Sequence, residues 1–236
     1  MSDNIPARER WGRWIGLGLF VGMIVWRMAH TPDLSASWIV WTRWSLVTSL
    51  FALFLLAYVR RTRARALAEG WRETGFALLC AGFPFAVELG PHLLDTWLTW
   101  SSLPEPQVFI ASIENLGWSD ARPGLILMAL GEAIAVAGML TLGSSFSIFT
   151  EVRELRRDGL YKYIRHPLYT GEILALWGMA LSFPCWWRIV GAALFTLFQL
   201  SRAKVEERKL ERYFPDYAQY RRETGFVLPK LFPLNK

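Results

Sequence analysis

Long apolar runs separated by short charged segments form the dominant pattern along the chain. A helix that crosses a membrane needs about 20 predominantly apolar residues. The strict alternation of apolar and polar residues that indicates half-buried strands is absent. The pattern therefore predicts an all-α protein that spans a bilayer about six times. The expected spans are Trp11–Met28, Trp38–Val59, Phe76–Leu94, Gly124–Phe149, Leu168–Phe183 and Trp187–Ser201.

The last two of these runs are short, and Pro184 lies at the turn between them. Segments of this length form a hairpin that tilts, or that stops short of the far leaflet. Beyond Arg202 we expect the second arm to continue as a helix through Tyr213, with a break at Pro215 and a short helix from Tyr217. The expected architecture is a multi-pass transmembrane helical bundle with a C-terminal helical tail.

Composition supports a multi-pass integral membrane protein. Of the 236 residues 53% are hydrophobic and 13 are Trp; the mean hydropathy is +0.24. Charged residues make up 19%, against about 25% in soluble domains. The net charge of +6 is typical of membrane proteins, whose basic residues gather in cytoplasmic loops and near anionic headgroups. We find no aromatic-basic module for nucleic acid, and three His with two scattered Cys do not give the spacing of a metal site.

The charges of two connecting segments set the expected orientation. Residues 60–73 carry five Arg against two Glu, a net charge of +3, whereas residues 95–123 carry four acids against one Arg, a net charge of −3. The positive-inside rule places the first segment in the cytoplasm and the second outside. Counting spans then places the N-terminus, residues 150–167 and the C-terminal tail in the cytoplasm.

Two polar clusters bracket the short hairpin and would lie on the same side of the membrane. The first is Arg165-His166-Pro167-Leu168-Tyr169-Thr170-Gly171-Glu172. Its proline suits the first turn of a helix, whose free N–H groups attract a carboxylate or phosphate, and its aromatic rings offer faces to a heterocycle or an onium group. In the second cluster Arg202 and Glu206 are spaced i, i+4, so they share one helix face. A snorkelling interfacial loop and a simple surface ion pair are the alternatives.

Glu132 is the deepest acidic residue of the predicted spans. Ionisable residues inside a membrane are costly and are functional candidates by default. This carboxyl group either faces an acceptor cavity or bridges helices by accepting hydrogen bonds, and the sequence leaves both open.

At these residues the chain resembles the isoprenylcysteine carboxyl methyltransferase and phospholipid methyltransferase superfamily of integral membrane enzymes. The resemblance runs from about Gly138 to Pro229. Its motifs are Leu142-Gly143-Ser-Ser145-Phe146-Ser, Gly159-x-Tyr161-x-x-x-Arg165-His166-Pro167-x-Tyr169-x-Gly171, Arg202-x-x-x-Glu206-Glu207-x-x-Leu210 and Tyr217-x-x-Tyr220. It implies one integrated membrane domain, with N-terminal spans and an external loop at 1–123 and a catalytic core at 124–236.

The resemblance also implies S-adenosyl-L-methionine as the cofactor, bound in a cytoplasm-facing pocket. By motif position this pocket would be lined by Leu155, Tyr161, His166, Pro167, Leu168, Tyr169 and Glu206. Glu206 would hold the cofactor's ammonium group. Arg202 would face the acceptor, with Glu132 as a second acceptor residue, and Arg202 and Glu206 would be the catalytic pair.

The expected function is methyl transfer to a lipophilic acceptor that enters from the bilayer. The acceptor stays open between a prenylcysteine-type carboxylate, a phospholipid amine and a small thiol. One alternative is an NADPH-dependent reductase similar to the steroid 5α-reductases and sterol reductases, which share Arg-His-Pro-x-Tyr-x-Gly-Glu; the Arg202/Glu206/Glu207 block fits the methyltransferases better. The other alternative is a lipid-binding scaffold without enzymatic activity.

Overall fold

The computed structural model describes residues 7–60, 68, 70–100, 120–152, 154–182 and 184–230. Within these ranges the regular structure is helical, apart from one isolated bridge between Ile164 and Gly225, and this confirms the all-α class. The α-helices are α1 (Ala7–Ala29), α2 (Trp38–Val59), α3 (Gly70–Trp100), α5 (Arg122–Leu142), α6 (Pro167–Ser182), α7 (Trp186–Tyr213) and α8 (Tyr217–Glu223). Two 3₁₀ turns occupy Gly143–Ser145 and Gly159–Lys162.

Most predicted spans coincide with observed helices, but the fourth was predicted too long. The apolar run extends to Phe149, whereas α5 ends at Leu142, where Gly143 adopts a positive φ of 53°. Glycine has no Cβ and takes this left-handed conformation without strain, so it ends the helix. The apolar side chains that follow turn inward instead, and Phe146, Ile148 and Phe149 are buried. The extension of α7 through Tyr213 and the short helix that follows are confirmed.

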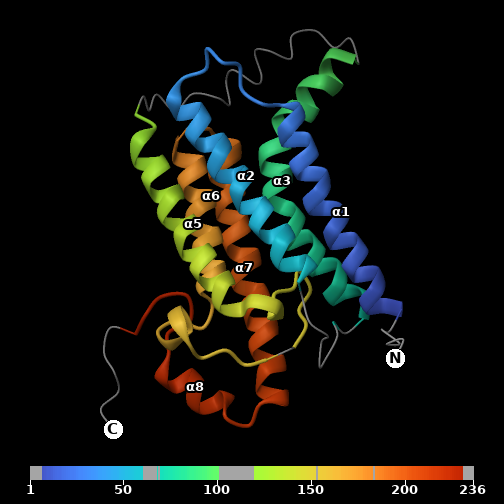
Figure 1. Ribbon diagram of the computed structural model, residues 1–236, viewed down its shortest axis with the longest axis vertical. Helices are drawn as coiled ribbons and strands as arrows, with labels where there is room; N and C mark the ends of the chain where they lie inside the picture. Colours follow the sequence, from blue (N-terminus) through green and yellow to red (C-terminus); the bar gives the residue numbers. More distant parts are fainter. Residues whose placement is uncertain are drawn as a thin grey trace.

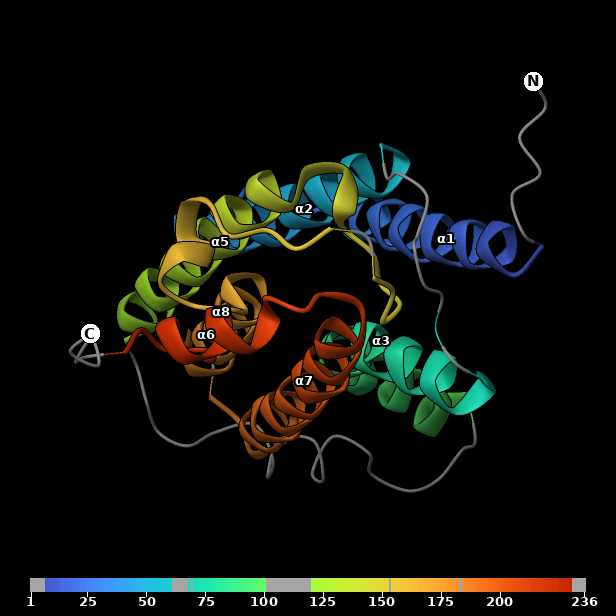
Figure 2. The same cartoon turned by 90° about the horizontal axis from the view of Figure 1, so that it is seen from below.

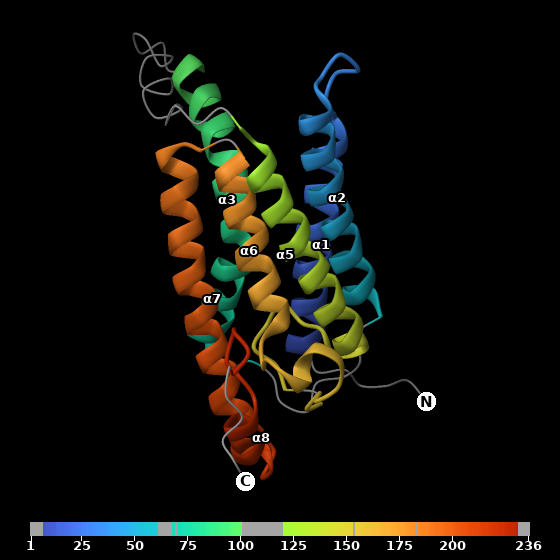
Figure 3. The ribbon, with the colours of Figure 1, turned by 90° about the vertical axis from the view of Figure 1, so that its left-hand side faces the viewer.

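The long helices form a bundle, with α8 at one end. Seen along the bundle in Figure 2, helices α1, α2 and α5 form one row, and α3, α6 and α7 lie opposite it. Helix α7 continues beyond the other helices to reach α8 (Figure 3). The first turn of α1 and helix α8 lie at the same end of the molecule (Figure 1). We call this end the α8 end; it also carries both polar clusters of the hairpin.

Helices α5 and α6 pack with their backbones in contact because glycines face each other across the interface. A methyl group added at Gly131 would lie 2.7 Å from the carbonyl oxygen of Gly171, and one added at Gly178 would lie 2.7 Å from the carbonyl oxygen of Gly124. Small residues at such positions allow close packing of membrane helices, where lipid removes the hydrophobic drive for association. We call this contact the glycine seam. It fixes the hairpin's first arm against α5.

The outer surface of the bundle is apolar. Exposed large apolar side chains include Val21 and Val25 on α1, Ile126 and Leu130 on α5, and Leu197 on α7. Helices α2 and α5 are long and apolar enough to cross a membrane by length and composition. The charged segments that set the expected orientation fall largely on residues 61–67, 69 and 101–119, which lie outside the described residues, as does most of the predicted external loop.

A cluster of charges joins the first three helices inside the bundle, near the end opposite to α8. The carboxylate of Glu88 on α3 accepts from Arg43 on α2 at 2.8 Å and from Arg27 on α1 at 3.4 Å. Arg27 also donates to the carbonyl of Trp44 at 2.8 Å. Buried charges persist where they are paired and hydrogen-bonded, and this cluster ties α1 and α2 to α3.

Candidate active site

The first polar cluster is held in place by the C-terminal segment, which crosses it as an extended strap. The backbone N–H groups of Arg165 and His166 donate to the carbonyls of Gly225 and Phe226 at 2.9 and 3.1 Å. The hydroxyl of Thr170 donates to the carbonyl of Val227 at 2.8 Å. These bonds satisfy backbone groups that an interfacial loop would otherwise leave unpaired. Residues 165 to 170 are therefore held by the C-terminal strap as well as by α6.

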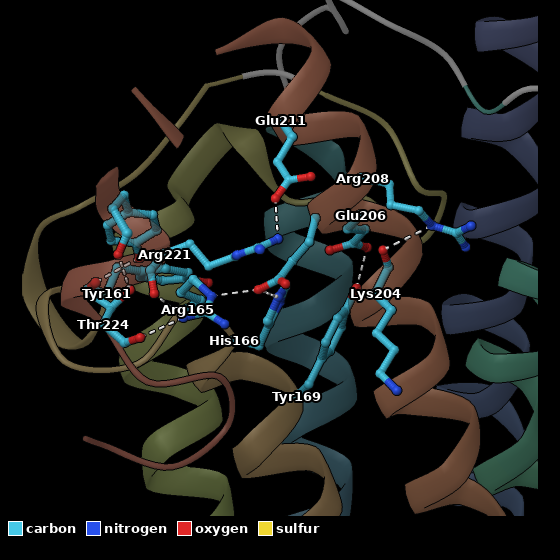
Figure 4. A network of polar contacts seen from close by, with 12 residues as sticks. Tyr161, Arg165, His166, Tyr169, Lys204, Glu206, Arg208, Glu211, Arg221 and Thr224 are labelled. Carbon is cyan, nitrogen blue, oxygen red and sulfur yellow. Dashed lines mark hydrogen bonds and ion pairs between the residues drawn. The ribbon is translucent and has the colours of Figure 1, made fainter. Parts of the chain in front are cut away.

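An ion cluster then ties this loop to α7 (Figure 4). The Nε of Arg165 donates to Glu207 at 2.5 Å, and its Nη1 donates to the carbonyl of Thr224 at 2.5 Å. The Nε2 of His166 lies 3.4 Å from the same Glu207 carboxylate. Burial alone would raise the pKa of Glu207, but His166 and Arg165 outweigh it and lower the pKa to about 2. Glu207 is therefore a charged structural anchor at neutral pH.

Tyr169 occupies the centre of the site. Its hydroxyl donates to the carboxylate of Glu206, which also lies 3.5 Å from the Nε of Arg202. The guanidinium carbon of Arg202 is 5.1 Å from the centroid of the Tyr169 ring, a cation–π distance. The His166 ring is parallel to the Tyr169 ring, with 5.5 Å between centroids. The structure thus brings His166, Tyr169, Arg202 and Glu206 together, as the sequence predicted.

A pocket opens at the α8 end above this group. Its empty volume, including the mouth to solvent, is about 840 Å³. Six of the seven predicted cofactor residues line it: Leu155, Tyr161, His166, Leu168, Tyr169 and Glu206. Pro167 does not line it, because this residue is fully buried in the first turn of α6. Its role is to start the helix.

The donor set of this pocket suits a zwitterionic ligand with an aromatic heterocycle. The Glu206 carboxylate can accept from a cation, and the Oγ1 of Thr150 is buried without a hydrogen-bond partner. Burial raises the pKa of the Tyr161 phenol well above its ordinary value, so this ring stays neutral. A carboxylate, an orphaned polar atom and neutral aromatic faces are what the methionine end and the adenine of S-adenosylmethionine require.

A second cavity lies deeper, between the two rows of helices. Its empty volume, including the space at its opening, is about 970 Å³, and its walls are mostly apolar side chains from α1, α2, α3, α5, α6 and α7. Arg202 and Glu132, the two predicted acceptor residues, line this cavity and not the solvent-facing pocket. Phe146 and Tyr169 line both spaces. These two side chains therefore form the wall between a polar pocket and an apolar cavity.

Arg202 holds this wall in place. Its Nη2 donates to the carbonyl of Ile148 at 2.5 Å and to that of Ser147 at 3.2 Å. The segment that closes the cavity is thereby fixed to α7. The predicted contact of Arg202 with Glu206 is present, so both partners of the i, i+4 pair are confirmed as neighbours.

Sequence reasoning assigned no role to several residues that the structure places in the site. Glu172 and Gln199 line the deep cavity, and the Nε2 of Gln199 donates to the Glu172 carboxylate. Lys209 donates to Glu73 at 2.6 Å and to the carbonyl of Thr150 at 2.8 Å. Glu172 follows the glycine of the first motif, and a polar Gln199 inside an apolar run is itself a signal. Lys209 carries no such signal, because its partners lie far away in the sequence.

The arrangement of the two spaces points to a class of protein. A helical bundle that separates a polar pocket from an apolar cavity by a single aromatic wall suits an enzyme that joins a water-soluble reactant to a lipophilic one. Among the described residues no group of His, Cys, Asp and Glu has the arrangement of a metal site.

Comparison with known proteins points to the same kind of enzyme. Residues 121–217 match the sequence model of the phospholipid methyltransferase family. Methanethiol S-methyltransferase 2 of Bradyrhizobium diazoefficiens is 26% identical over 205 residues, covering 80% of this chain and 74% of that protein. Methanethiol S-methyltransferase of Pseudomonas deceptionensis is 30% identical over 149 residues, covering 61% and 47%. Protein-S-isoprenylcysteine O-methyltransferase of Homo sapiens is 24% identical over 162 residues, covering 62% and 56%.

These matches confirm the resemblance that the motifs indicated. Over residues 121–217 the chain is similar to the phospholipid methyltransferase family, and its relatives named methyltransferases support a membrane methyltransferase of this kind. It spans about half the length of the second and third relatives named above. The matched segment begins just before α5 and ends at the start of α8, so it contains the glycine seam, the hairpin and both polar clusters.

Proposed function

We propose that this protein is an S-adenosylmethionine-dependent methyltransferase that acts on a lipophilic or membrane-borne acceptor. The observation that carries the proposal is the shared wall of Phe146 and Tyr169, with a polar pocket on one side and an apolar cavity on the other. The cofactor would occupy the polar pocket and supply the reactive methyl group. The acceptor would occupy the cavity and reach the methyl group past the tyrosine.

Different residues of the polar pocket would hold different parts of the cofactor. Glu206 would pair with the ammonium group, and its orientation is set by the Tyr169 hydroxyl. Thr150 would donate or accept through its Oγ1, which is without a hydrogen-bond partner, and the ring of His166, held beside Glu207, would line the pocket. Tyr161 and Leu155 would flank the heterocycle. Holding two reactants in line supplies much of the acceleration in a displacement reaction, so alignment is the main contribution of these side chains.

We also propose that the long helices span the membrane about six times, with the α8 end in the cytoplasm. The first turn of α1 and helix α8 share that end, which agrees with an even number of spans. The net charge of +3 on residues 60–73 supports the orientation. A water-soluble cofactor would then enter from the cytoplasm, and a lipophilic acceptor would enter from the bilayer.

The first experiment is cofactor binding to detergent-purified protein by isothermal calorimetry and thermal shift. S-adenosylhomocysteine and NADPH are compared side by side. We expect S-adenosylhomocysteine to bind and raise the unfolding temperature, and Glu206→Ala to weaken its affinity tenfold or more. A charge-assisted hydrogen bond is worth about 1.5–3 kcal/mol, and about 1.4 kcal/mol corresponds to a factor of ten.

Glu211→Ala is the matched control. Glu211 lies on the same helix and pairs with Arg221, but it does not line the pocket, so its loss should leave cofactor affinity unchanged. Stabilisation by NADPH alone would refute methyl transfer and favour the reductase, and binding of neither would favour the lipid-binding scaffold. If Arg202→Ala spares both turnover and acceptor affinity, the acceptor role of Arg202 is wrong.

A further inference from the structure

The polar side chains that line the deep cavity are gathered toward its two ends. Arg27 on α1 and Glu88 on α3 line it at the end opposite to α8, where they form an ion pair. The remaining lining side chains are mostly apolar. Toward the α8 end the polar ones are Glu132, Tyr169, Glu172, Gln199 and Arg202. An apolar tail inside the cavity would therefore meet a charged pair at its far end.

Arg27 is held firmly at this far end. Its Nη1 donates to Glu88 at 3.4 Å, its Nη2 to the carbonyl of Trp44 at 2.8 Å, and its Nε to the hydroxyl of Thr48 at 3.2 Å. Its guanidinium carbon also lies 5.6 Å from the centroid of the Trp44 ring, a cation–π distance. The residue is only 4% exposed. Breaking a buried ion pair is strongly destabilising, so an apolar chain end would not displace this side chain.

The helices that line the cavity give its length. The lining residues run from Phe20 to Arg27 on α1, from Cys80 to Glu88 on α3 and from Tyr169 to Met179 on α6. With a rise of about 1.5 Å per residue, these stretches are about 10–15 Å long. With a C–C bond of about 1.52 Å and a near-tetrahedral angle, an extended alkyl chain advances about 1.25 Å per carbon. The cavity therefore matches a chain of about eight to twelve carbons.

We propose that Arg27 and Glu88 set a length limit for the apolar tail of the acceptor. A tail of up to about eight to twelve carbons reaches from the wall of the cofactor pocket to this ion pair. A longer tail must separate the buried pair or leave part of itself outside the cavity, and both weaken its binding. The inference rests on the proposed function, because it assigns the deep cavity to the acceptor.

Straight-chain primary alcohols are suitable probes, because a hydroxyl group fits the polar atoms nearest the pocket wall. The Oε1 of Gln199 and the Nε of Arg202 are buried without a hydrogen-bond partner, and both side chains line the cavity. The two residues are three positions apart on α7, so they share one face of the helix. A hydroxyl can donate to the first and accept from the second. Such a probe measures the length of the cavity whichever atom of the natural acceptor is methylated.

The test measures the binding of the alcohols from hexanol to hexadecanol to the full chain, purified in a sterol-based detergent that has no alkyl chain of its own. The alcohols are compared at equal mole fractions in the micelle, because a micelle interior is as apolar as the cavity and longer chains also enter it more readily. Affinity follows from the rise in unfolding temperature with alcohol concentration. We expect similar affinities up to about eight to twelve carbons, and affinities weaker by about tenfold or more beyond that length.

Arg27→Ala removes the end of the cavity, and Glu88 keeps its 2.8 Å partner Arg43. We expect this variant to bind the long alcohols as well as the short ones. Arg43→Gln is the matched control, because Arg43 pairs with the same carboxylate but does not line the cavity; its limit should equal that of the wild type. If Arg27→Ala fails to fold, Val47→Phe enlarges a side chain at the far end and should lower the limit.

Equal binding of every alcohol by the wild-type protein, or binding of none, would overturn the length limit. A limit that neither Arg27→Ala nor Val47→Phe moves would also overturn it, as would a limit that Arg43→Gln abolishes. Binding of S-adenosylhomocysteine is measured on the same preparations. If it persists while the length limit fails, the proposed function still stands; if the wild-type protein does not bind it, the proposed function itself is wrong.

Discussion

The glycine seam between α5 and α6 allows a sharp test of the fold. We predict that Gly131→Ala destabilises the protein, although alanine is the better helix former by about 0.5–1 kcal/mol. The added methyl group would lie 2.7 Å from the carbonyl oxygen of Gly171. It would come closer still to the backbone nitrogen of Ala175. Ordinary contacts of a Cβ begin at 3.4 Å, so the two helices must separate by at least about 0.7 Å.

The obstructing atoms are backbone atoms, so no side chain can rotate away to make room. Overpacking of a filled interface typically costs about 1–3 kcal/mol, which exceeds the gain in helix propensity. The matched control is Gly22→Ala on α1, where nothing lies within 4 Å of the added methyl group. This variant keeps the gain in propensity and lacks the clash, so it should be as stable as the wild type or more stable.

The free energy of unfolding is measured for the three proteins in mixed micelles, by circular dichroism against increasing denaturant. The expected order of stability is Gly22→Ala at or above wild type, and Gly131→Ala below both by about 1–2 kcal/mol. Equal effects of the two substitutions would show that the seam does not hold the helices at the observed distance.

Three further predictions concern the α8 end of the site. The folded-state pKa of Glu207 is lowered from 4.5 to about 2, so its contribution to stability is complete above about pH 4.5 and is lost as the pH falls toward 2. Glu207→Gln should flatten the dependence of the unfolding temperature on pH in this window, and an unchanged slope would contradict it. Lys209→Met removes the 2.6 Å contact between Lys209 and the partly buried carboxylate of Glu73 and should cost about 1–3 kcal/mol in denaturant unfolding; the double variant with Glu73→Gln should recover part of the loss. Tyr169→Phe removes the donor to Glu206 and should weaken S-adenosylhomocysteine binding about tenfold by calorimetry, whereas full affinity would show that the hydroxyl does not orient the carboxylate.

The lengths of the apolar runs and the local signals for helix ends predicted the helices well, because the apolar runs are long. They were wrong at the end of α5, where apolar residues continue past the helix. Phe146 and Ile148 are apolar because both line the deep cavity, where Phe146 also faces the polar pocket, and not because they are helical. A hydropathy pattern reports burial or lipid contact, and it does not distinguish a helix from an irregular segment that folds back into the bundle.

The sequence predicted which residues come together in the site, but not how they are divided between the polar pocket and the deep cavity. Helical spacing is sufficient to place Arg202 beside Glu206, and the structure confirms the pair. The spacing does not show that Glu206 faces the polar pocket while Arg202 faces the deep cavity, because the boundary depends on where Phe146 folds. Sequence spacing also could not predict the ion pair of Glu207 with Arg165, because Arg165 precedes Glu207 by 42 residues.

The start of α6 serves both spaces because three polar residues follow one another along it. His166 immediately precedes the helix, and within the helix Glu172 lies three residues, about 4.5 Å, beyond Tyr169. His166 lines the polar pocket, Tyr169 lines both spaces and Glu172 lines only the cavity. A displacement of α6 along its axis by one such step would exchange these roles. The backbone contact at the glycine seam prevents this displacement, so the residues that fix the fold of the hairpin also decide which side chain faces which reactant.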